Sequence, residues 1–296
     1  MKRFPSFSEI VKLARPRTLP ASISPVIIGS ALAFKDGGFL LVPALLCFGV
    51  AVFAQIASNM ANDYFDFRNG VDTDERKGPE RMIATGKVEP KPVLYCALIS
   101  LCLSCLCGLG LLFFAPWWLI FVGIAMALCV FAYSAGPYPL SQHALGDVAV
   151  LLFYGLIPVC FTYFVQTGTF TWESLIYAVS VGLLSVNILI VNNYRDYEED
   201  RAAGKITTIV LFGKNFGGVA YLMNLTVAVL LPFFFIRYDH SSERVALMTV
   251  ILITGFSIWR ELYTKQGKAL NVTLGRTSIL VFAYVLVASM LMLFGS

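Results

Sequence analysis

Charged side chains are scarce in this sequence. Only 14% of its 296 residues are Asp, Glu, Lys or Arg, whereas 58% are apolar. An average globular protein carries about a quarter charged residues and is about half apolar. The mean hydropathy of +0.76 points the same way. This composition excludes an ordinary water-soluble domain and indicates an integral membrane protein.

Histidine is scarcer still, with two residues in the whole chain. His143 and His240 fall in loops that we expect on opposite sides of the membrane, so they cannot form a metal-binding or acid–base pair. All seven cysteines lie inside apolar runs, where a thiol packs as a small hydrophobic group, and a zinc site is not expected. Basic residues are dispersed among membrane-flanking loops, which argues against nucleic-acid binding.

Long apolar runs recur along the chain. A hydrocarbon core of about 30 Å requires about 20 residues of helix. A shorter segment at 1–17 mixes apolar and basic residues, as an amphipathic helix on the membrane surface does. The sequence therefore predicts nine membrane-spanning helices, at residues 18–34, 39–58, 93–114, 117–134, 146–165, 173–193, 217–236, 244–260 and 277–295.

The distribution of Lys and Arg predicts the orientation, because cytoplasmic loops carry their excess. With the N-terminus inside, the outer segments hold only Lys35, Arg237 and Arg244 of the 22 basic residues. We therefore expect one all-α membrane domain covering 1–296, with a cytoplasmic N-terminus. Its helices should surround a central cavity open to the cytoplasmic side, and the polar segments 59–92 and 192–216 should form active-site loops there.

Two similar stripes of polar residues begin these loops. Asn59, Asp63 and Asp66 follow one apolar run at helical spacing, and the second stripe, Asn192, Asp196 and Asp200, follows another. Like charges one helical turn apart repel, so a stripe repeated twice requires a compensating cation. Ligands that are oxygen alone favour a hard ion such as Mg²⁺, which leaves coordination positions for substrate phosphates.

Basic residues follow both stripes and would neutralise a diphosphate. In a bilayer, a diphosphate is naturally carried by a long isoprenoid tail. The pattern is therefore typical of an allylic diphosphate site. The Gly- and Pro-rich segment 133–140 cannot be regular helix and would place Tyr133 and Tyr138 over the site. The basic residues considered are Arg76, Lys77, Arg81 and Lys205.

Over essentially its whole length, the sequence resembles the UbiA superfamily of intramembrane aromatic prenyltransferases. The resemblance rests on the nine apolar runs, on Asn59-x-x-x-Asp63-x-x-Asp66 and on Asp196-x-x-x-Asp200. Within the superfamily it is most similar to the branch that prenylates 1,4-dihydroxy-2-naphthoate in menaquinone biosynthesis. The segments that carry this similarity are 62–67, Gly70-x-Asp72, Arg76-Lys77-Gly78-Pro79, Asn193-x-Arg195-Asp196 and Ala202-Ala203-Gly204-Lys205.

The resemblance implies Mg²⁺-dependent transfer of a prenyl group from a polyprenyl diphosphate to the naphthoate ring, with loss of CO₂ to give demethylmenaquinone, in the inner membrane of a bacterium. Asp63, Asp66, Asp196 and Asp200 would hold the metal. Asp72, Tyr133 and Tyr138 would orient or deprotonate the acceptor. The substrate-binding residues expected are Asn59, Asn62, Arg76, Lys77, Arg81, Asn192, Asn193, Arg195 and Lys205.

Two alternatives remain open from the sequence. The same prenyl transfer could use another acceptor, such as 4-hydroxybenzoate, homogentisate or a porphyrin-derived ring. The segment 140–143 lacks the basic residues that the hydroxybenzoate branch carries there, which weakens that acceptor. An ion-coupled transporter would also place acids inside a membrane bundle. It does not explain why the acid clusters are confined to the inner loops.

Overall fold

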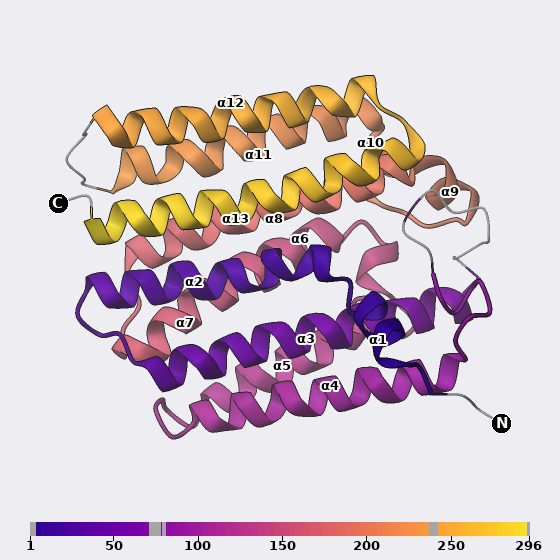
Figure 1. Ribbon diagram of the computed structural model, residues 1–296, viewed down its shortest axis with the longest axis horizontal. Coiled ribbons are helices and arrows are strands. Elements are labelled where there is room, and N and C mark those ends of the chain that lie inside the picture. The colour runs from indigo at the N-terminus through magenta and orange to yellow at the C-terminus, as the bar shows by residue number, and fades with distance from the viewer. Residues whose placement is uncertain (1–3, 71–77, 79–80, 237–241, 295–296) are drawn as a thin grey trace.

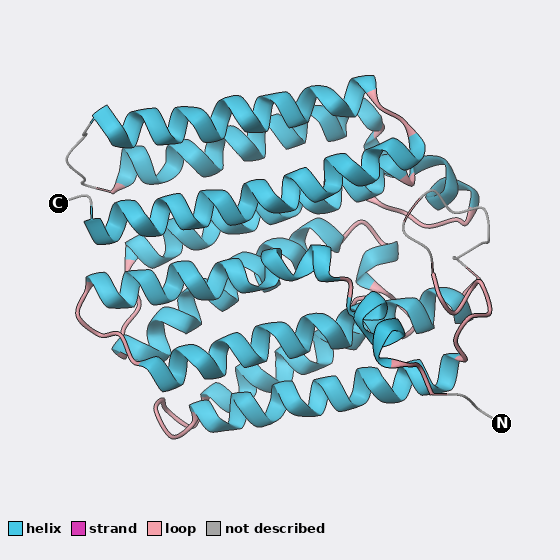
Figure 2. Cartoon of the chain, in the orientation of Figure 1, coloured by secondary structure: helices cyan, strands magenta, loops and turns pink. Residues whose placement is uncertain are grey.

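The computed structural model describes residues 4–70, 78, 81–236 and 242–294, and each regular element among them is a helix (Figures 1 and 2). The long helices run side by side as one bundle (Figure 1). The α-helices are α1 Phe7–Ala14, α2 Leu19–Lys35, α3 Leu41–Arg68, α4 Pro90–Leu111, α5 Leu119–Ala132, α6 Gly146–Leu151, α7 Ile157–Thr167, α8 Trp172–Arg195, α9 Tyr197–Ala202, α10 Thr208–Phe212, α11 Lys214–Phe235, α12 Ser242–Thr264 and α13 Leu270–Phe294.

Seven helical segments in the described part of the chain are long and apolar enough to cross a membrane. The prediction of nine spans is therefore confirmed for seven. The two other apolar runs fold as α2, with 17 residues, and α5, with 14 residues. Large apolar side chains such as Phe113, Trp117 and Leu128 are exposed on the outside of the bundle, as in a protein that faces lipid. The chain is a multi-pass integral membrane protein.

The N-terminal segment folds as predicted into a short amphipathic helix. Ser6 and Glu9 form a capping box at the start of α1, and the helix ends at Ala14 because Pro16 lacks a backbone N–H. Phe7 is exposed while Leu13 is buried against Met60 of α3. A bend of 64° separates α1 from α2, so α1 lies across one end of the bundle.

The segment predicted as one helix over 146–165 is irregular. It runs as α6, a π-helical turn at Leu152–Leu156 and then α7. Pro158 has no backbone N–H to continue the α-helical ladder, and such a π-helical turn re-satisfies the hydrogen bonds. Inside the turn, Gly155 packs directly on Gly182 of α8, and a Cβ built on Gly155 would lie 2.5 Å from the Cα of Gly182.

Polar side chains join helices of the C-terminal half. Asn224 on α11 donates a hydrogen bond of 3.0 Å to Asn187 on α8. Tyr284 on α13 is fully buried and donates one of 3.2 Å to the carbonyl of Ala228. These contacts make α8, α11 and α13 a rigid frame behind the polar end of the bundle.

The contact between Gly155 and Gly182 generates a stability prediction. Gly155→Ala inserts a methyl group against backbone atoms of α8, which a close-packed interior cannot accommodate without moving the helix. We expect the melting temperature in detergent to fall by about 5 °C or more. Gly275→Ala is the matched control, since no atom lies within 4 Å of its Cβ position. Equal melting temperatures of the two variants would contradict the close packing of Gly155 on Gly182.

Candidate functional site

The two polar loops predicted from the sequence lie at the same end of the bundle (Figure 1). The last turns of α3 carry Asp63 and Asp66, and the junction of α8 and α9 carries Asp196 and Asp200. All four carboxylate side chains are buried. An apolar bundle buries acids only where other groups compensate their charge, so their surroundings decide what this end of the protein binds.

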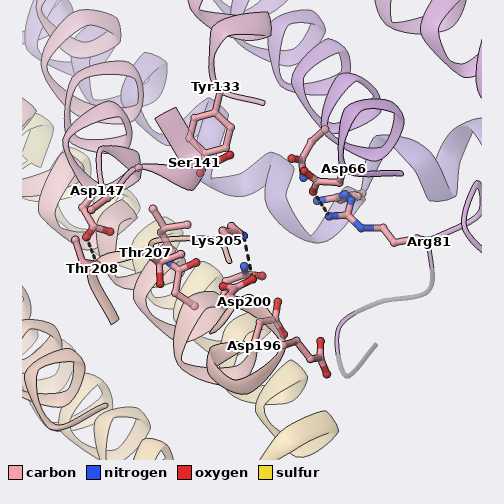
Figure 3. A pocket seen from close by; sticks show the side chains of 18 residues that line it. Asp66, Arg81, Tyr133, Ser141, Asp147, Asp196, Asp200, Lys205, Thr207 and Thr208 are labelled. Carbon is pink, nitrogen blue, oxygen red and sulfur yellow. Dashed lines mark hydrogen bonds and ion pairs between the residues drawn. The ribbon is translucent and has the colours of Figure 1, made fainter. Parts of the chain in front are cut away.

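A polar cavity of about 70 Å³ lies between the two acid clusters. Figure 3 shows Asp66 and Arg81 on one side of it, Asp196 and Asp200 with Lys205 below, Tyr133 above, and Asp147 with Thr208 opposite. The residues that line it are Arg15, Asn62, Asp66, Arg81, Tyr133, Ser141, Ala144, Gly146, Asp147, Leu189, Asn192, Asn193, Asp196, Glu199, Asp200, Lys205, Thr207 and Thr208.

Arg81 compensates the first acid cluster. Its guanidinium donates to Asp63 and, over 3.3 Å, to Asp66, and its own side chain is buried. A second guanidinium, that of Arg15, also donates to Asp63. Arg15 stands at the bend between α1 and α2 with a positive φ of 51°. The N-terminal helix is thereby tied to the site by an ion pair as well as by apolar packing.

Arg195 compensates Asp196 in the second cluster. Two of its nitrogens bind the two oxygens of the Asp196 carboxylate, each over 2.6 Å. Its other hydrogen bonds, of 2.8 and 2.7 Å, reach the side-chain oxygens of Asn192 and Asn271. The predicted contact of Arg195 with substrate stays a prediction. The contacts observed make Arg195 the residue that positions Asp196.

Asp200 lies one turn beyond Asp196 and pairs with Lys205 over 3.2 Å. The second stripe is divided between two helices, because α8 ends at Arg195 and α9 begins at Tyr197. The backbone N–H of Asp200 still donates to the carbonyl of Asp196 over 2.8 Å, so helical spacing is retained across the junction. Gly204, with a φ of +70°, then turns the chain back and brings Lys205 to the carboxylate.

The loop after α5 is joined to the loop after α9. The N–H of Ala144 donates to the carbonyl of Ile206 over 2.7 Å, and the N–H of Ile206 donates to the carbonyl of Gln142 over 3.1 Å. The hydroxyl of Thr208 also donates to Asp147. These bonds hold the segment 140–147 over the second acid cluster and complete the wall of the polar cavity.

A larger cavity of about 900 Å³ meets the polar one. Arg15, Asn62, Arg81, Tyr133 and Asn192 line both. Farther along the bundle the lining becomes apolar, and it is contributed by α3, α4, α5 and α7. These apolar residues include Cys47, Leu101, Leu112, Ile120, Ile124, Phe153, Ile157 and Phe161. The two cavities together suit a molecule with a charged head and a long apolar tail.

The predicted site residues that the structure describes divide into three groups. The polar cavity is lined by Asn62, Asp66, Arg81, Tyr133, Asn192, Asn193, Asp196, Asp200 and Lys205. Asn59, Asp63 and Arg195 line only the larger cavity, and Asn59 also donates a hydrogen bond of 2.8 Å to the carbonyl of Ala14 and so attaches α3 to α1. Tyr138 is 58% exposed, stacks on His143 and is absent from the lining of both cavities. The predictions for Asp72, Arg76 and Lys77 lie outside the described residues.

Sequence reasoning missed three residues. Arg15 falls in the segment 1–17 that the sequence predicts on the membrane surface, and the sequence pattern singled out neither Asp147 nor Asn271 as a site residue. The neighbouring Pro16 marked a break in the chain at Arg15, and that break is the signal that could have identified it. No pattern connects Asn271 to the site, because it acts through Arg195 from the start of α13.

The donor atoms around the cavity suit a metal shared with a phosphate group. In the described part of the chain no three Asp, Glu, His or Cys residues form a ready-made metal site. Mg²⁺ commonly binds one or two carboxylates and completes its coordination with substrate phosphates and water. Asp66, Asp196 and Asp200 offer only oxygen ligands to the polar cavity, which is the chemistry that Mg²⁺ prefers.

Comparison with known proteins yields a family match over most of the chain. The model of the UbiA prenyltransferase family matches residues 22–274. The 1,4-dihydroxy-2-naphthoate octaprenyltransferase of Mycobacterium tuberculosis is 38% identical over 77% of this chain and 78% of its own length. The enzyme of the same name from Haemophilus influenzae is 36% identical over 73% of each chain.

A solved structure has the same fold. The UbiA homologue from Archaeoglobus fulgidus, bound to DMAPP and Mg²⁺, superposes with a TM-score of 0.67 at 16% identity, covering 95% of this chain and 98% of that chain.

The buried pairing of Arg195 generates a second prediction. Arg195→Met removes the two-point pairing of the buried Asp196 carboxylate, and we expect a loss of stability of about 3–5 kcal/mol. Lys35→Met breaks a partly exposed pair with Glu173 and should cost about 1 kcal/mol or less. Thermal unfolding in detergent measures both. Equal losses for the two variants would refute the proposed role of Arg195.

Proposed function

Because this chain belongs to the UbiA prenyltransferase family, we propose that it transfers a polyprenyl group from a polyprenyl diphosphate to 1,4-dihydroxy-2-naphthoate. The carboxylate of the acceptor leaves as CO₂, and the product is the prenyl naphthohydroquinone, the reduced form of a demethylmenaquinone. Curated relatives named for this octaprenyl transfer come from five bacteria and are 32–38% identical to the chain.

The observation that carries the proposal is the junction of the two cavities. Buried acids and basic residues from distant parts of the chain line the polar cavity, and an apolar cavity of about 900 Å³ continues from it into the bundle. A polyprenyl diphosphate has the same division into a charged head and an apolar tail. Its reactive carbon stands between the two parts, and so at the junction lined by Tyr133 and Asn192.

The diphosphate binds among the acid clusters. Asp63, Asp66, Asp196 and Asp200 would hold the Mg²⁺ that accompanies it, as the homologue from Archaeoglobus fulgidus was solved with DMAPP and Mg²⁺. Bound there, Mg²⁺ would neutralise charge on the diphosphate and favour its departure. Arg81 and Lys205 are already paired with these acids and can transfer their hydrogen bonds to phosphate oxygens. Asn62, Asn192 and Asn193 line the same cavity and orient the head group.

Transfer begins when the bond between the diphosphate oxygen and the first prenyl carbon breaks and its electron pair leaves with the diphosphate. The ring of Tyr133 stands where the cavities meet, so its π-face stabilises positive charge on the allylic carbon. The ring carbon that bears the carboxylate then supplies the electron pair for the new carbon–carbon bond. Loss of CO₂ returns the electron pair of the carbon–carboxylate bond to the ring and restores its aromaticity.

The orientation in the membrane follows from the distribution of basic residues. We assign the N-terminus and both acid loops to the cytoplasmic face of a bacterial inner membrane, because cytoplasmic loops carry the excess of Lys and Arg. The scarcity of Lys and Arg in the opposite loops supports this orientation. The chain then works as a single catalytic domain, with α1 lying on the cytoplasmic surface.

Competition among acceptors tests the reaction. Membranes containing the protein, a polyprenyl diphosphate and Mg²⁺ are incubated with equal amounts of 1,4-dihydroxy-2-naphthoate, 4-hydroxybenzoate and homogentisate. We expect mass spectrometry to detect the decarboxylated prenyl naphthohydroquinone or its quinone as the main product. Prenyl hydroxybenzoate as the main product would assign the chain to another acceptor.

Carboxylate variants test the diphosphate site. Asp66→Asn and Asp196→Asn retain the size of the side chain but remove the negative charge that would bind Mg²⁺, and we expect each to lower prenyl transfer by about 100-fold or more. Asp36→Asn is the control, since Asp36 lies at the opposite end of the bundle and binds only Tyr163 among the described contacts. EDTA should abolish the wild-type activity and Mg²⁺ should restore it. Near-wild-type activity in both site variants would refute the assignment.

A further inference from the structure

One wall of the polar cavity presents polar atoms that have no hydrogen-bond partner among the described residues. The Oδ1 atom of Asp147 and the hydroxyl oxygen of Ser141 are both buried and unpaired there. Both residues line the cavity, and Figure 3 shows them near Tyr133, across from Asp66 and Arg81. Buried polar atoms are almost always satisfied, so a pair of unsatisfied ones facing a cavity points to a ligand.

The fold positions this pair firmly. The hydroxyl of Thr208 donates to Oδ2 of Asp147 and leaves Oδ1 directed elsewhere. The N–H of Ser141 donates to the carbonyl of Tyr133 over 3.0 Å, which sets Ser141 beside the tyrosine. At Gly146, a Cβ would lie 3.7 Å from the Tyr133 hydroxyl and 4.0 Å from the Cα of Ser141. Tyr133 and Ser141 therefore lie beside Gly146, the residue that precedes Asp147 at the start of α6.

The chemistry of the wall differs from that of the acid clusters. Arg81 and Lys205 accompany the acids on the other sides of the cavity, whereas in the described contacts Asp147 has only the neutral hydroxyl of Thr208 as its partner. An ionised carboxylate without a basic partner repels a phosphate or a carboxylate. It accepts a hydrogen bond from a neutral hydroxyl strongly. Ser141 can donate to the oxygen of that hydroxyl and accept from another.

Apolar side-chain surfaces adjoin this wall of the polar cavity. Tyr133 and Leu189 line both cavities, so their side chains border the space between the wall and the reactive end of the prenyl chain. An aromatic ring placed there would contact a tyrosine face and a leucine side chain. A hydroxylated aromatic ring meets all these requirements together, since it combines a hydroxyl donor with two apolar faces.

We propose that Asp147 and Ser141 form the binding subsite for a ring hydroxyl of the aromatic acceptor. The inference rests on the proposed function and deepens it, by assigning the hydroxyl end of the acceptor to the start of α6. The carboxylate end of the acceptor then points away from Asp147, toward the basic side of the cavity. The hydrogen bond to Asp147 raises the electron density of the ring, so the wall both orients and activates the attacking carbon.

Steady-state kinetics with purified protein in detergent tests the subsite. Asp147→Asn and Ser141→Ala are each expected to raise the KM for 1,4-dihydroxy-2-naphthoate by 10-fold or more, with the KM for the polyprenyl diphosphate within twofold of wild type. Asp36→Asn, the same substitution at the opposite end of the bundle, should change neither. Unchanged acceptor KM values in the two subsite variants would overturn the proposal, and so would equal rises in the KM of both substrates.

Acceptor analogues provide a readout that a purely structural role of Asp147 would not affect. The two mono-methyl ethers of the naphthoate each remove one hydroxyl donor, and the added bulk is the same for every protein variant. For the ether that blocks the bound hydroxyl, the wild type should lose at least 10-fold in kcat/KM relative to the parent acceptor. In Asp147→Asn that loss should shrink to threefold or less. If the loss in kcat/KM with each ether were the same in Asp147→Asn as in the wild type, the proposal would be overturned.

Failure of this inference is distinct from failure of the proposed function. If the wild type yields no decarboxylated prenyl product from the naphthoate, the function itself is wrong. If the wild type yields that product while Asp147→Asn and Ser141→Ala retain its acceptor KM, only the subsite is wrong. Should Asp147→Asn fail to fold, the Ser141→Ala variant with the two ethers carries the same test, because loss of one hydroxyl leaves the bond between Thr208 and Asp147 intact.

Discussion

The cost of burying negative charge at the end of an apolar bundle is the constraint on which this structure depends. Four aspartates are buried there, and each carboxylate lies against a cation: Arg15 and Arg81 at Asp63, Arg81 again at Asp66, Arg195 at Asp196, and Lys205 at Asp200. Truncating one partner of such a pair leaves a buried charge without compensation. The cations are therefore as necessary to this end of the bundle as the acids themselves.

These ion pairs also suit the arrival of a diphosphate with its metal. The ligand and its metal bring charges of both signs, so acids can turn to the metal and basic side chains to the phosphate without leaving either unpaired. Asp196 is the exception among the acids, because the two-point pairing with Arg195 and the support of Asn271 hold its orientation. One side of the site is thus preorganised while the pairing at Asp63 and Asp66 is free to rearrange.

Much of the fold and of the diphosphate site was predictable from local patterns. The apolar runs predicted the long helices, and the helical spacing of Asp63 and Asp66 predicted two carboxylates on one stripe of α3. The count of nine spans was confirmed for seven. The run predicted at 18–34 folds as the 17-residue α2, which is bent by 64° from α1, and the run predicted at 117–134 folds as the 14-residue α5. Length and hydropathy show neither the bend nor the shortening. Asp196 and Asp200 lie on either side of a helix junction. Their spacing in the sequence does not reveal it, because the junction leaves the hydrogen-bond spacing nearly unchanged.

The sequence alone determined that the chain crosses a membrane, where its acids lie along the helices and which ion and head group they suit, because these follow from composition and from spacing within one helix. Only the tertiary structure decided which distant residues meet: Arg15 with Asp63, Asn271 with Arg195, and Asp147 with Ser141 and Tyr133. Such meetings depend on how helices cross and how loops join, as at Ala144 and Ile206. No periodicity along the chain encodes them, since helix packing is set by many side chains at once.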